Sequence, residues 1–236
     1  MSLQGRVAVI AGATGELGRT VASALAQAQV RVVLVGTNQE RLTKLSSDLA
    51  LSSEQTLLHV ANLRDSPEAQ GLAQAVADKF GRVDILLNLV GGWIGGKTVV
   101  EFSTTDTEDM LQQHLWTTWH LSQAFVPRLL NNGWGRILLI SSPIVTRPAA
   151  NNAPYAIGKA AQDALMMTLA QELRGTRVTA NVLQVGTIDT KRERDRQRTP
   201  ENASWTTPEE ITAAVLYLCS EEAQVINGAR IPLYGG

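Results

Sequence analysis

The sequence predicts an α/β fold of three layers, in which helices cover both faces of a doubly wound, seven-stranded parallel sheet. Short apolar runs alternate with amphipathic stretches along the whole chain, which is the order expected of successive βαβ units. Most of these runs are apolar at every position, as parallel strands covered on both faces are. A glycine-rich turn follows the first run, where sheets of this kind bind ligands. We expect one domain over residues 1–236.

Composition narrows the class of protein. The 236 residues are 44% hydrophobic and 18% charged with a net charge of −1, so neither nucleic acid nor an anionic membrane is an expected partner. The single cysteine, Cys219, lies in an apolar helical pattern and cannot form an intrachain disulfide, which fits a reducing compartment. No apolar run reaches the roughly 18 residues of a membrane span, and the first strand leaves no room for a signal peptide. We therefore expect a cytoplasmic protein.

Each element has its own signal. Two capping boxes are expected, Thr207-Pro-Glu-Glu210 with Pro at the first helical position and Thr37-Asn-Gln-Glu40. A long helix is expected from about Thr107 to Leu130. The seven strands are expected at Val7–Ala11, Val30–Val35, Thr56–Val60, Ile85–Asn88, Ile137–Ser141, Val178–Leu183 and Arg230–Leu233.

The turn after the first strand reads Gly12-Ala-Thr-Gly15-Glu-Leu-Gly18 and opens an amphipathic helix. Glycines let the backbone turn sharply and approach a pyrophosphate, whose charge then sits at the helix N-terminus. A strand before the turn and a helix after it give the motif its weight. This turn predicts a dinucleotide site.

Tyr155 and Lys159 stand four residues apart in a predicted helix and therefore lie on one face. A phenol has a pKa of about 10, and a nearby ammonium lowers it, so that the tyrosine can act as a general acid or base. Ser142 ends the apolar strand thirteen residues upstream, where its hydroxyl can hold a carbonyl oxygen. A Tyr-x-x-x-Lys alone also fits a buried aromatic beside a surface lysine, so the rest of the chain must decide.

Taken together, these motifs resemble the short-chain dehydrogenase/reductase family. Besides the glycine turn and Tyr155 to Lys159, the stretches Asp84–Gly91, Gly135–Ser142, Val185–Thr190 and Asn227–Gly236 fall in the family's order. The resemblance implies a Rossmann fold and NAD(P)-dependent hydride transfer to or from a carbonyl or alcohol. Tyr155 would be the proton donor or acceptor, and Ser142, rather than Ser141, would hold the substrate oxygen. Lys159 would bind the nicotinamide ribose and tune Tyr155.

The resemblance also implies which residues bind the cofactor. They come from the glycine turn, from the ends of the second to fourth strands, from the Tyr-Lys helix and from the segment after the sixth strand. The expected set is Gly12, Thr14, Gly15, Leu17, Gly18, Gly36, Thr37, Asn38, Asn62, Leu63, Asn88, Val90, Gly91, Tyr155, Lys159, Gly186, Ile188 and Thr190.

Several positions depart from the family pattern. Glu16 stands where a glycine is usual, Leu89-Val90 replaces part of an Asn-Asn-Ala-Gly motif, and Val185 replaces a proline. His114 stands where an asparagine normally supports a proton-relay water, so it is either an active proton carrier or a helix residue with no proton role. The remaining histidines, His59 and His120, show no metal-ligand spacing, and no metal site is expected.

The end of the second strand bears on the cofactor. NAD-dependent members of the family usually place an acid there, because a carboxylate binds the ribose hydroxyls and repels a 2′-phosphate. Here the strand ends in Val35-Gly36-Thr37-Asn38, without an acid and without an arginine. We therefore expect NADP to be preferred and NAD to be possible. Asn62 would meet the adenine amino group through its side-chain carbonyl.

Substrate and partner expectations rest on aromatic residues. Trp93 lies in the glycine-rich loop Gly91–Gly96 and is expected either to form a flat wall of the substrate pocket, which favours planar ring substrates, or to anchor the loop. With Leu115-Trp116-Thr117 this loop resembles dihydropteridine reductases locally. Trp116 and Trp119 are expected to pack, at the interface of a homodimer or homotetramer formed through helices 105–130 and 152–174.

A polar loop over about 189–206, with five bases and two acids between Lys191 and Arg198, is either a solvated loop or a lid over the substrate. The sequence thus predicts a reductase of a small carbonyl substrate. The alternatives are a pteridine-type reductase and a dinucleotide-binding regulatory protein with little catalysis.

Overall fold

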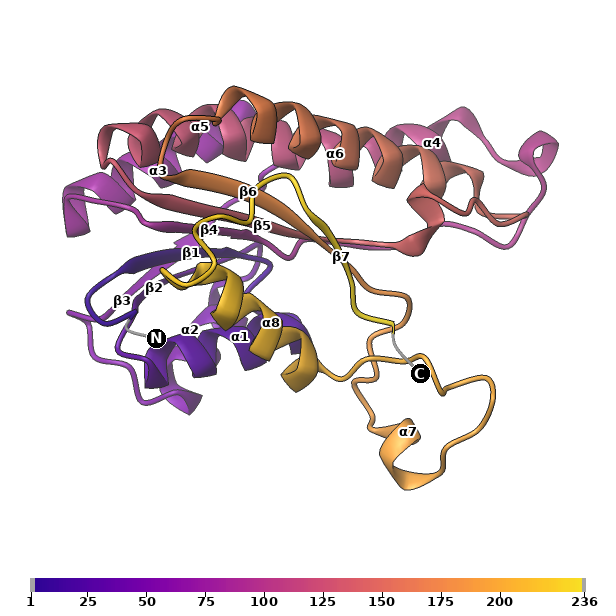
Figure 1. The fold of residues 1–236 in the computed structure, drawn as a ribbon, viewed down its shortest axis with the longest axis horizontal. Helices are drawn as coiled ribbons and strands as arrows, with labels where there is room; N and C mark the ends of the chain where they lie inside the picture. The colour runs from indigo at the N-terminus through magenta and orange to yellow at the C-terminus, as the bar shows by residue number, and fades with distance from the viewer. Residues whose placement is uncertain (1–2, 235–236) are drawn as a thin grey trace.

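A computed structural model describes residues 3–234 and contains one seven-stranded parallel sheet with the strand order β3-β2-β1-β4-β5-β6-β7 (Figure 1). The predicted fold class is confirmed, and every predicted strand is present, with some ends displaced by a residue or two. The strands are β1 (Val7–Ala11), β2 (Arg31–Gly36), β3 (Thr56–Val60), β4 (Ile85–Asn88), β5 (Gly135–Ser141), β6 (Val178–Gln184) and β7 (Arg230–Pro232).

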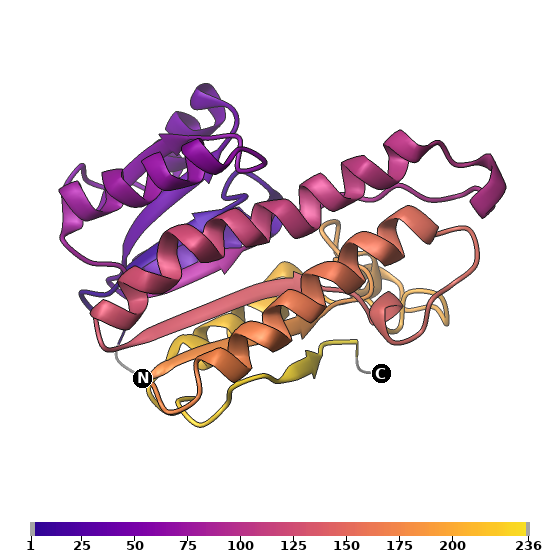
Figure 2. The same cartoon turned by 90° about the horizontal axis from the view of Figure 1, so that it is seen from above.

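Helices form the two outer layers (Figures 1 and 2). One face of the sheet carries α1 (Glu16–Gln27), α2 (Gln39–Asp48) and α8 (Pro208–Cys219); the other carries α3 (Ser66–Phe80), α4 (Thr104–Leu111), α5 (Thr117–Asn131) and α6 (Ala153–Glu172). Alternation along β1 shows why both layers are needed, because Val7 and Val9 enter one apolar core while Ala8 and Ile10 enter the other. None of the helices within residues 3–234 is long and apolar enough to cross a membrane.

The strand order creates the crevice in which a ligand can bind. From β1 the chain moves outward to β2 and β3 and then returns to the other side of β1 to form β4. The connections that leave β1 and β4 therefore diverge at the carboxyl edge of the sheet, which is the topological switch point of this fold class. The glycine turn and residues 89–92 border this crevice.

The helix expected from about Thr107 to Leu130 is interrupted. The five-residue π-helical turn η2 (Gln112–Trp116) joins α4 to α5, and Figure 2 shows the two helices as one long rod beside α6. A π-turn inserts an extra residue into the helix and is frequent at functional sites. Here it brings His114 into the buried space beside α6. Single-turn 3₁₀ helices lie at η1 (Val99–Glu101) and η3 (Pro143–Val145).

The two expected capping boxes have different outcomes. At α8, Thr207 Oγ1 accepts from the Glu210 N–H at 3.3 Å and Glu210 Oε2 accepts from the Thr207 N–H at 2.8 Å, as predicted. At α2 the prediction of Thr37 as the cap is wrong, because the helix begins later. Asn38 is its N-cap and accepts from the Arg41 N–H at 2.9 Å.

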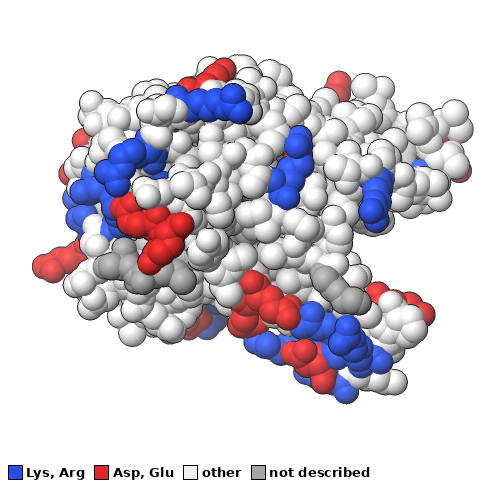
Figure 3. All heavy atoms as spheres, in the orientation of Figure 1, with Lys and Arg blue, Asp and Glu red and all other residues white. Residues whose placement is uncertain are grey.

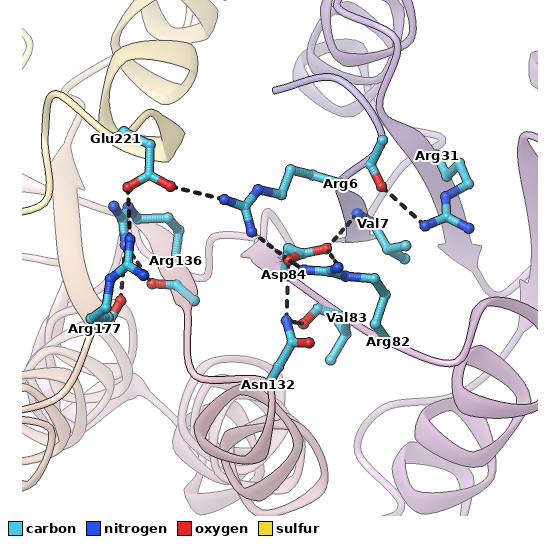
Figure 4. A network of polar contacts seen from close by, with 12 residues as sticks. Arg6, Val7, Arg31, Arg82, Val83, Asp84, Asn132, Arg136, Arg177 and Glu221 are labelled. Carbon is cyan, nitrogen blue, oxygen red and sulfur yellow. Dashed lines mark hydrogen bonds and ion pairs between the residues drawn. The ribbon is translucent and has the colours of Figure 1, made fainter. Parts of the chain in front are cut away.

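At the opposite edge of the sheet a buried carboxylate ties several elements together (Figure 4). Asp84 is 0% exposed and accepts hydrogen bonds from Arg6, Arg82, Asn132 and the backbone N–H of Val7, at 2.5–3.1 Å. Burial alone would raise the pKa of Asp84, but the hydrogen bonds from Arg82, Val7 and Arg6 outweigh it and hold that pKa below its usual value. This network fixes the start of β1 against β4 and α5.

Candidate functional site

Two adjoining cavities, of about 640 and 320 Å³, run along the carboxyl edge of the sheet. They share lining residues from the glycine turn and from the segment after β4, namely Gly12, Gly15, Leu89, Val90 and Gly91. One cavity extends toward the ends of β2 and β3 and the other toward α6. The crevice thus has the elongated form that a dinucleotide needs.

The glycine turn is built so that backbone, rather than side chains, faces the crevice. Gly12 has φ +83°, and a Cβ there would lie 3.0 Å from the Leu89 carbonyl carbon. A Cβ at Gly18 would overlap the carbonyl oxygen of Gly12. Gly15 is the N-cap of α1, and no side chain caps this helix end, so its first N–H groups are available to an anion. These features fit a pyrophosphate.

The larger cavity collects the residues predicted for the adenosine end, together with two arginines that were not predicted. Gly36, Thr37, Asn62 and Leu63 line it as expected, and so do Arg41 and Arg64. Asn38 does not line it, because its side chain caps α2. Arg41 Nη2 donates to the Thr14 carbonyl at 2.9 Å, which lays the guanidinium across the mouth of the glycine turn. Arg41 was not predicted because it lies in the first turn of α2, five residues after the end of β2, and not directly after the strand.

The smaller cavity brings together Tyr155, Lys159 and the predicted residues after β6, and these are Gly186, Ile188 and Thr190. Leu17 and Gly18 from α1 complete this end. The Ser142 hydroxyl accepts from the Ile144 N–H at 3.3 Å and is near enough to the Tyr155 phenol to lower its pKa. Ser142 does not line the cavity, whereas Ser141 does, with its hydroxyl buried without a partner among residues 3–234. The structure therefore places Ser142 beside the tyrosine.

The electrostatics of Tyr155 differ from the expectation. Burial raises the pKa of its phenol, and the nearby Ser142 hydroxyl offsets only part of this rise. The expected lowering by Lys159 does not act on this pKa, because the lysine ammonium is bound elsewhere. Lys159 Nζ donates to the Ile140 carbonyl at 2.8 Å and to Gln162 Oε1 at 3.1 Å. Burial lowers the pKa of Lys159 to about 7.

His114 lies against the same tyrosine without the features of a proton carrier. Its ring meets the Tyr155 ring edge-on with centroids 5.7 Å apart, and Nε2 lies 3.2 Å from the Gly92 carbonyl oxygen. Burial, helped by the charge of Lys159, lowers the pKa of His114 to about 3, so the imidazole is neutral at physiological pH. The geometry favours a role in holding residues 91–92 against η2.

Asn88 and Val90 shape the turn after β4. Asn88 does not line either cavity; its Oδ1 accepts from the Val90 N–H at 3.1 Å, and its Nδ2 donates to Thr118 Oγ1 at 2.9 Å. Val90 itself lines both cavities. The asparagine therefore orients the backbone that faces the ligand rather than the ligand itself.

Comparison with known proteins decides the family. The family model described as "short chain dehydrogenase" matches residues 6–201. The chain belongs to this family. It is 30% identical to the 3-oxoacyl-[acyl-carrier-protein] reductase FabG of Vibrio cholerae over 245 aligned positions, covering 100% of this chain and 98% of the relative. It is also 30% identical to an uncharacterized oxidoreductase of Staphylococcus epidermidis, over 78% of this chain and 79% of that one.

Among solved structures, a short chain dehydrogenase from Bacillus anthracis superposes with a TM-score of 0.87 at 27% identity, covering 97% of this chain and 94% of that one. The chain is therefore an oxidoreductase of the short chain dehydrogenase family, and membership implies a nicotinamide cofactor.

In this short chain dehydrogenase, Trp93 has the contacts of a loop anchor. Its Nε1 donates to Asn152 Oδ1 at 2.9 Å, and a Cβ at Gly95 would overlap the indole ring. The Gly96 N–H also donates to the Asn151 carbonyl at 2.7 Å. Trp93 is 61% exposed and does not line the cavity that holds Tyr155 and Lys159. Trp93 therefore does not form a flat wall of this cavity, and the reason for expecting planar ring substrates no longer holds.

The polar loop at 189–206 is tied to its own base and to α8. Asp189 accepts from the N–H groups of Glu193 and Arg194, both at 2.9 Å, and Arg194 pairs with Glu210 at 2.6 Å. Figure 3 shows its bases gathered beside acids at the end of the molecule that carries the short helix α7 (Glu193–Arg196). Beyond Thr190, no residue of this loop lines either cavity, so the loop does not cover the crevice in this conformation.

Proposed function

We propose that this protein is an NAD(P)-dependent reductase of carbonyl substrates, with Tyr155 as its general acid. The observation that supports this most is the meeting of Tyr155 and Lys159 at one end of a crevice whose other parts fit a dinucleotide, with Ser142 next to Tyr155. When bound, the nicotinamide supplies a hydride to the carbonyl carbon. Tyr155 Oη donates a proton to the carbonyl oxygen, and an alcohol results; the reverse sequence oxidises an alcohol.

Each of the three residues has a separate task. Ser142 is near enough to the Tyr155 phenol to lower its pKa, so its hydroxyl can hold a carbonyl oxygen within reach of the proton. The raised pKa of Tyr155 keeps the phenol protonated, which suits a donor in the direction of reduction. Lys159 presents its remaining N–H to the cavity, where a ribose hydroxyl can accept it.

Activity across a panel of substrates tests this proposal. Oxidation of NADPH and NADH should be followed with 3-oxoacyl thioesters, which the names of the relatives suggest, with cyclic and aliphatic ketones, and with a quinonoid dihydropteridine. We expect turnover of at least one carbonyl class. Turnover of the pteridine alone would instead support reduction of a C=N bond. Tight cofactor binding without turnover would support the regulatory alternative.

We further propose that NADP is the preferred cofactor, with Arg41 facing its 2′-phosphate. Gly36 leaves no carboxylate at the end of β2, and both Arg41 and Arg64 line the adenosine end of the crevice. Arginine binds phosphate in a planar, bidentate manner. Arg64 is partly engaged by Asp109 at 3.4 Å, whereas Arg41 is hydrogen-bonded to a backbone carbonyl and forms no ion pair within residues 3–234.

Titration of the protein with both cofactors measures this preference. We expect tighter binding of NADPH than of NADH, and a loss of roughly tenfold in NADPH affinity alone in Arg41→Ala, because only NADPH carries the phosphate. Gly36→Asp should favour NADH; a Cβ there makes ordinary contacts of 3.4–3.5 Å, so the fold should accept it. Lys44→Ala on the same helix is the control, since Lys44 pairs with Asp48 and does not line the cavity. Tighter binding of NADH by the wild type would contradict the proposal.

We also propose that this protein forms a homo-oligomer. Trp116, Trp119, Leu130 and Ile157 are each 40–46% exposed on α5, α6 and the turn between α4 and α5. These exposed apolar side chains lie within the helices 105–130 and 152–174, through which we propose that a homodimer or homotetramer forms.

A further inference from the structure

The ammonium of Lys159 is held in an unusual way for a buried charge. Lys159 is 4% exposed, and no carboxylate pairs with it within residues 3–234. Its acceptors are instead a backbone carbonyl, that of Ile140, and a side-chain amide, that of Gln162. Gln162 is 0% exposed and follows Lys159 by almost one turn of α6. A buried amide facing a buried ammonium needs a partner on its other side.

That partner is Thr118, at the start of α5. Gln162 Nε2 donates to Thr118 Oγ1 at 2.8 Å, Asn88 Nδ2 donates to the same oxygen at 2.9 Å, and the hydroxyl donates to the His114 carbonyl at 2.7 Å. The directions of these bonds are forced. Lysine only donates, so the amide oxygen of Gln162 must face it and the amide NH₂ must face Thr118; the threonine proton is then left for the carbonyl.

We propose that Gln162 is a positioning residue of the active site, which holds the Lys159 ammonium at the cofactor cavity while Thr118 fixes the orientation of the glutamine amide. The inference rests on the proposed function, because Lys159 acts there on the cofactor. Through these hydrogen bonds β4, the π-turn η2, α5 and α6 are all connected to Lys159 Nζ. It thus connects the interrupted helix to the chemistry of the site.

The surroundings of Lys159 leave few other groups to set its charge. Tyr155 and the neutral His114 are its titratable neighbours, Glu16 lines the same cavity without contributing to the lowered pKa of Lys159, and β6 and η3 carry no charged residue. Asp163, next to Gln162, is bound by Arg230 at 2.6–3.1 Å. On α4, Asp106 is held by Ser103, Asp109 pairs with Arg64, and Glu108 is exposed.

Removing the Gln162 carbonyl should therefore change the titration of Lys159. The carbonyl stabilises the charged form of Lys159, whereas burial destabilises that form and lowers the pKa of Lys159 to about 7. Gln162→Leu should lower this pKa by about one unit or more, since a hydrogen bond to a charged group is lost. Gln162→Glu, with a carboxylate in the same place, should raise it. A residue that only fills space would not give shifts of opposite sign.

The first measurement is NMR titration of the cofactor-free protein labelled in its lysines, with Lys159→Ala to assign the signal. Gln171→Leu makes the same exchange on an exposed part of α6 and should leave the Lys159 pKa unchanged. Because this measurement needs no turnover, it tests the network even if no carbonyl is reduced. An unmoved Lys159 pKa in both Gln162 variants, or a shift of the same sign in both, would overturn the proposal.

The second measurement is the pH dependence of carbonyl reduction with NADPH. Charged Lys159 is needed for the reaction, so kcat/KM falls as pH rises through the pKa of Lys159. This basic limb should move down by about one pH unit in Gln162→Leu and up in Gln162→Glu, following the titration. If the NMR pKa moves while the limb stays in place, Gln162 sets the charge of Lys159 without serving the reaction, and the positioning role is refuted. Absence of reduction by the wild type would count against the proposed function instead.

Discussion

Replacement of Tyr155 by phenylalanine is expected to lower the turnover of carbonyl substrates by roughly 10²–10⁴-fold, the range supplied by a positioned acid–base group. The exchange keeps the ring, which packs edge-on against His114, and removes only the hydroxyl next to Ser142. Cofactor affinity should change little, because Lys159 keeps its bonds to Ile140 and Gln162. Steady-state kinetics and a cofactor titration on the same preparation separate these two effects.

Tyr217→Phe provides the matched control. Tyr217 lies on α8, is 42% exposed and lines neither cavity of the crevice, so turnover should equal that of the wild type. Full activity in Tyr155→Phe would show that another group, or water, supplies the proton, and the mechanism proposed above would have to be abandoned.

Asp84→Asn is expected to reduce the free energy of unfolding by about 3–5 kcal/mol, the usual cost of breaking a buried ion pair by removing one partner. Asp84 is fully buried and holds Arg6 and Arg82 (Figure 4). An amide keeps the shape of the side chain but leaves both guanidinium groups facing a neutral group. Urea unfolding at neutral pH measures the loss, and Asp48→Asn, in an exposed pair with Arg19 and Lys44, should cost less than about 1 kcal/mol.

The pH dependence of this difference gives a further check. The pKa of Asp84 is lowered in the folded protein, so its ionised form contributes stability above the unfolded pKa of about 3.9. That contribution is lost as the pH falls through the lower, folded value. The gap between wild type and Asp84→Asn should therefore narrow in acid. A constant gap from neutral pH down to acid unfolding would mean that packing, rather than charge, makes Asp84 important.

The fold was predictable because the strands consist mostly of apolar residues, which must be buried by helices on both faces of the sheet. Val7 to Ala11 are an example. The positions of Tyr155, Lys159 and the glycine turn beside the crevice were predictable, because each follows from a short motif in one stretch of the chain. The interruption of the helix at Gln112–Trp116 was not predictable, because a π-turn has no periodicity of its own and depends on the contacts of α6.

The missed residues were of another kind. In the sequence, Gln162 looks like any polar residue of a helix. Its proposed role depends on the hydrogen bond to Thr118, which lies 44 residues earlier in the chain. Trp93 was misleading for the same reason, since the hydrogen bond to Asn152 that turns the indole toward α6 joins two separate loops. Such pairs become visible only when the crossover connections bring distant segments together.

The interlocked glycines of the first turn limit how this protein can change. Gly12 has no room for a side chain because of Leu89, and Gly18 has none because of Gly12 itself, so a mutation at either position is blocked by backbone rather than by an adaptable side chain. Gly15 and Glu16 are exposed, and a Cβ at Gly15 would make an ordinary contact of 3.5 Å. The outer rim of the turn, at positions 15 and 16, is therefore where a side chain can be accommodated. A library aimed at new cofactors should randomise this rim together with Gly36 and Arg41 and leave the two inner glycines untouched.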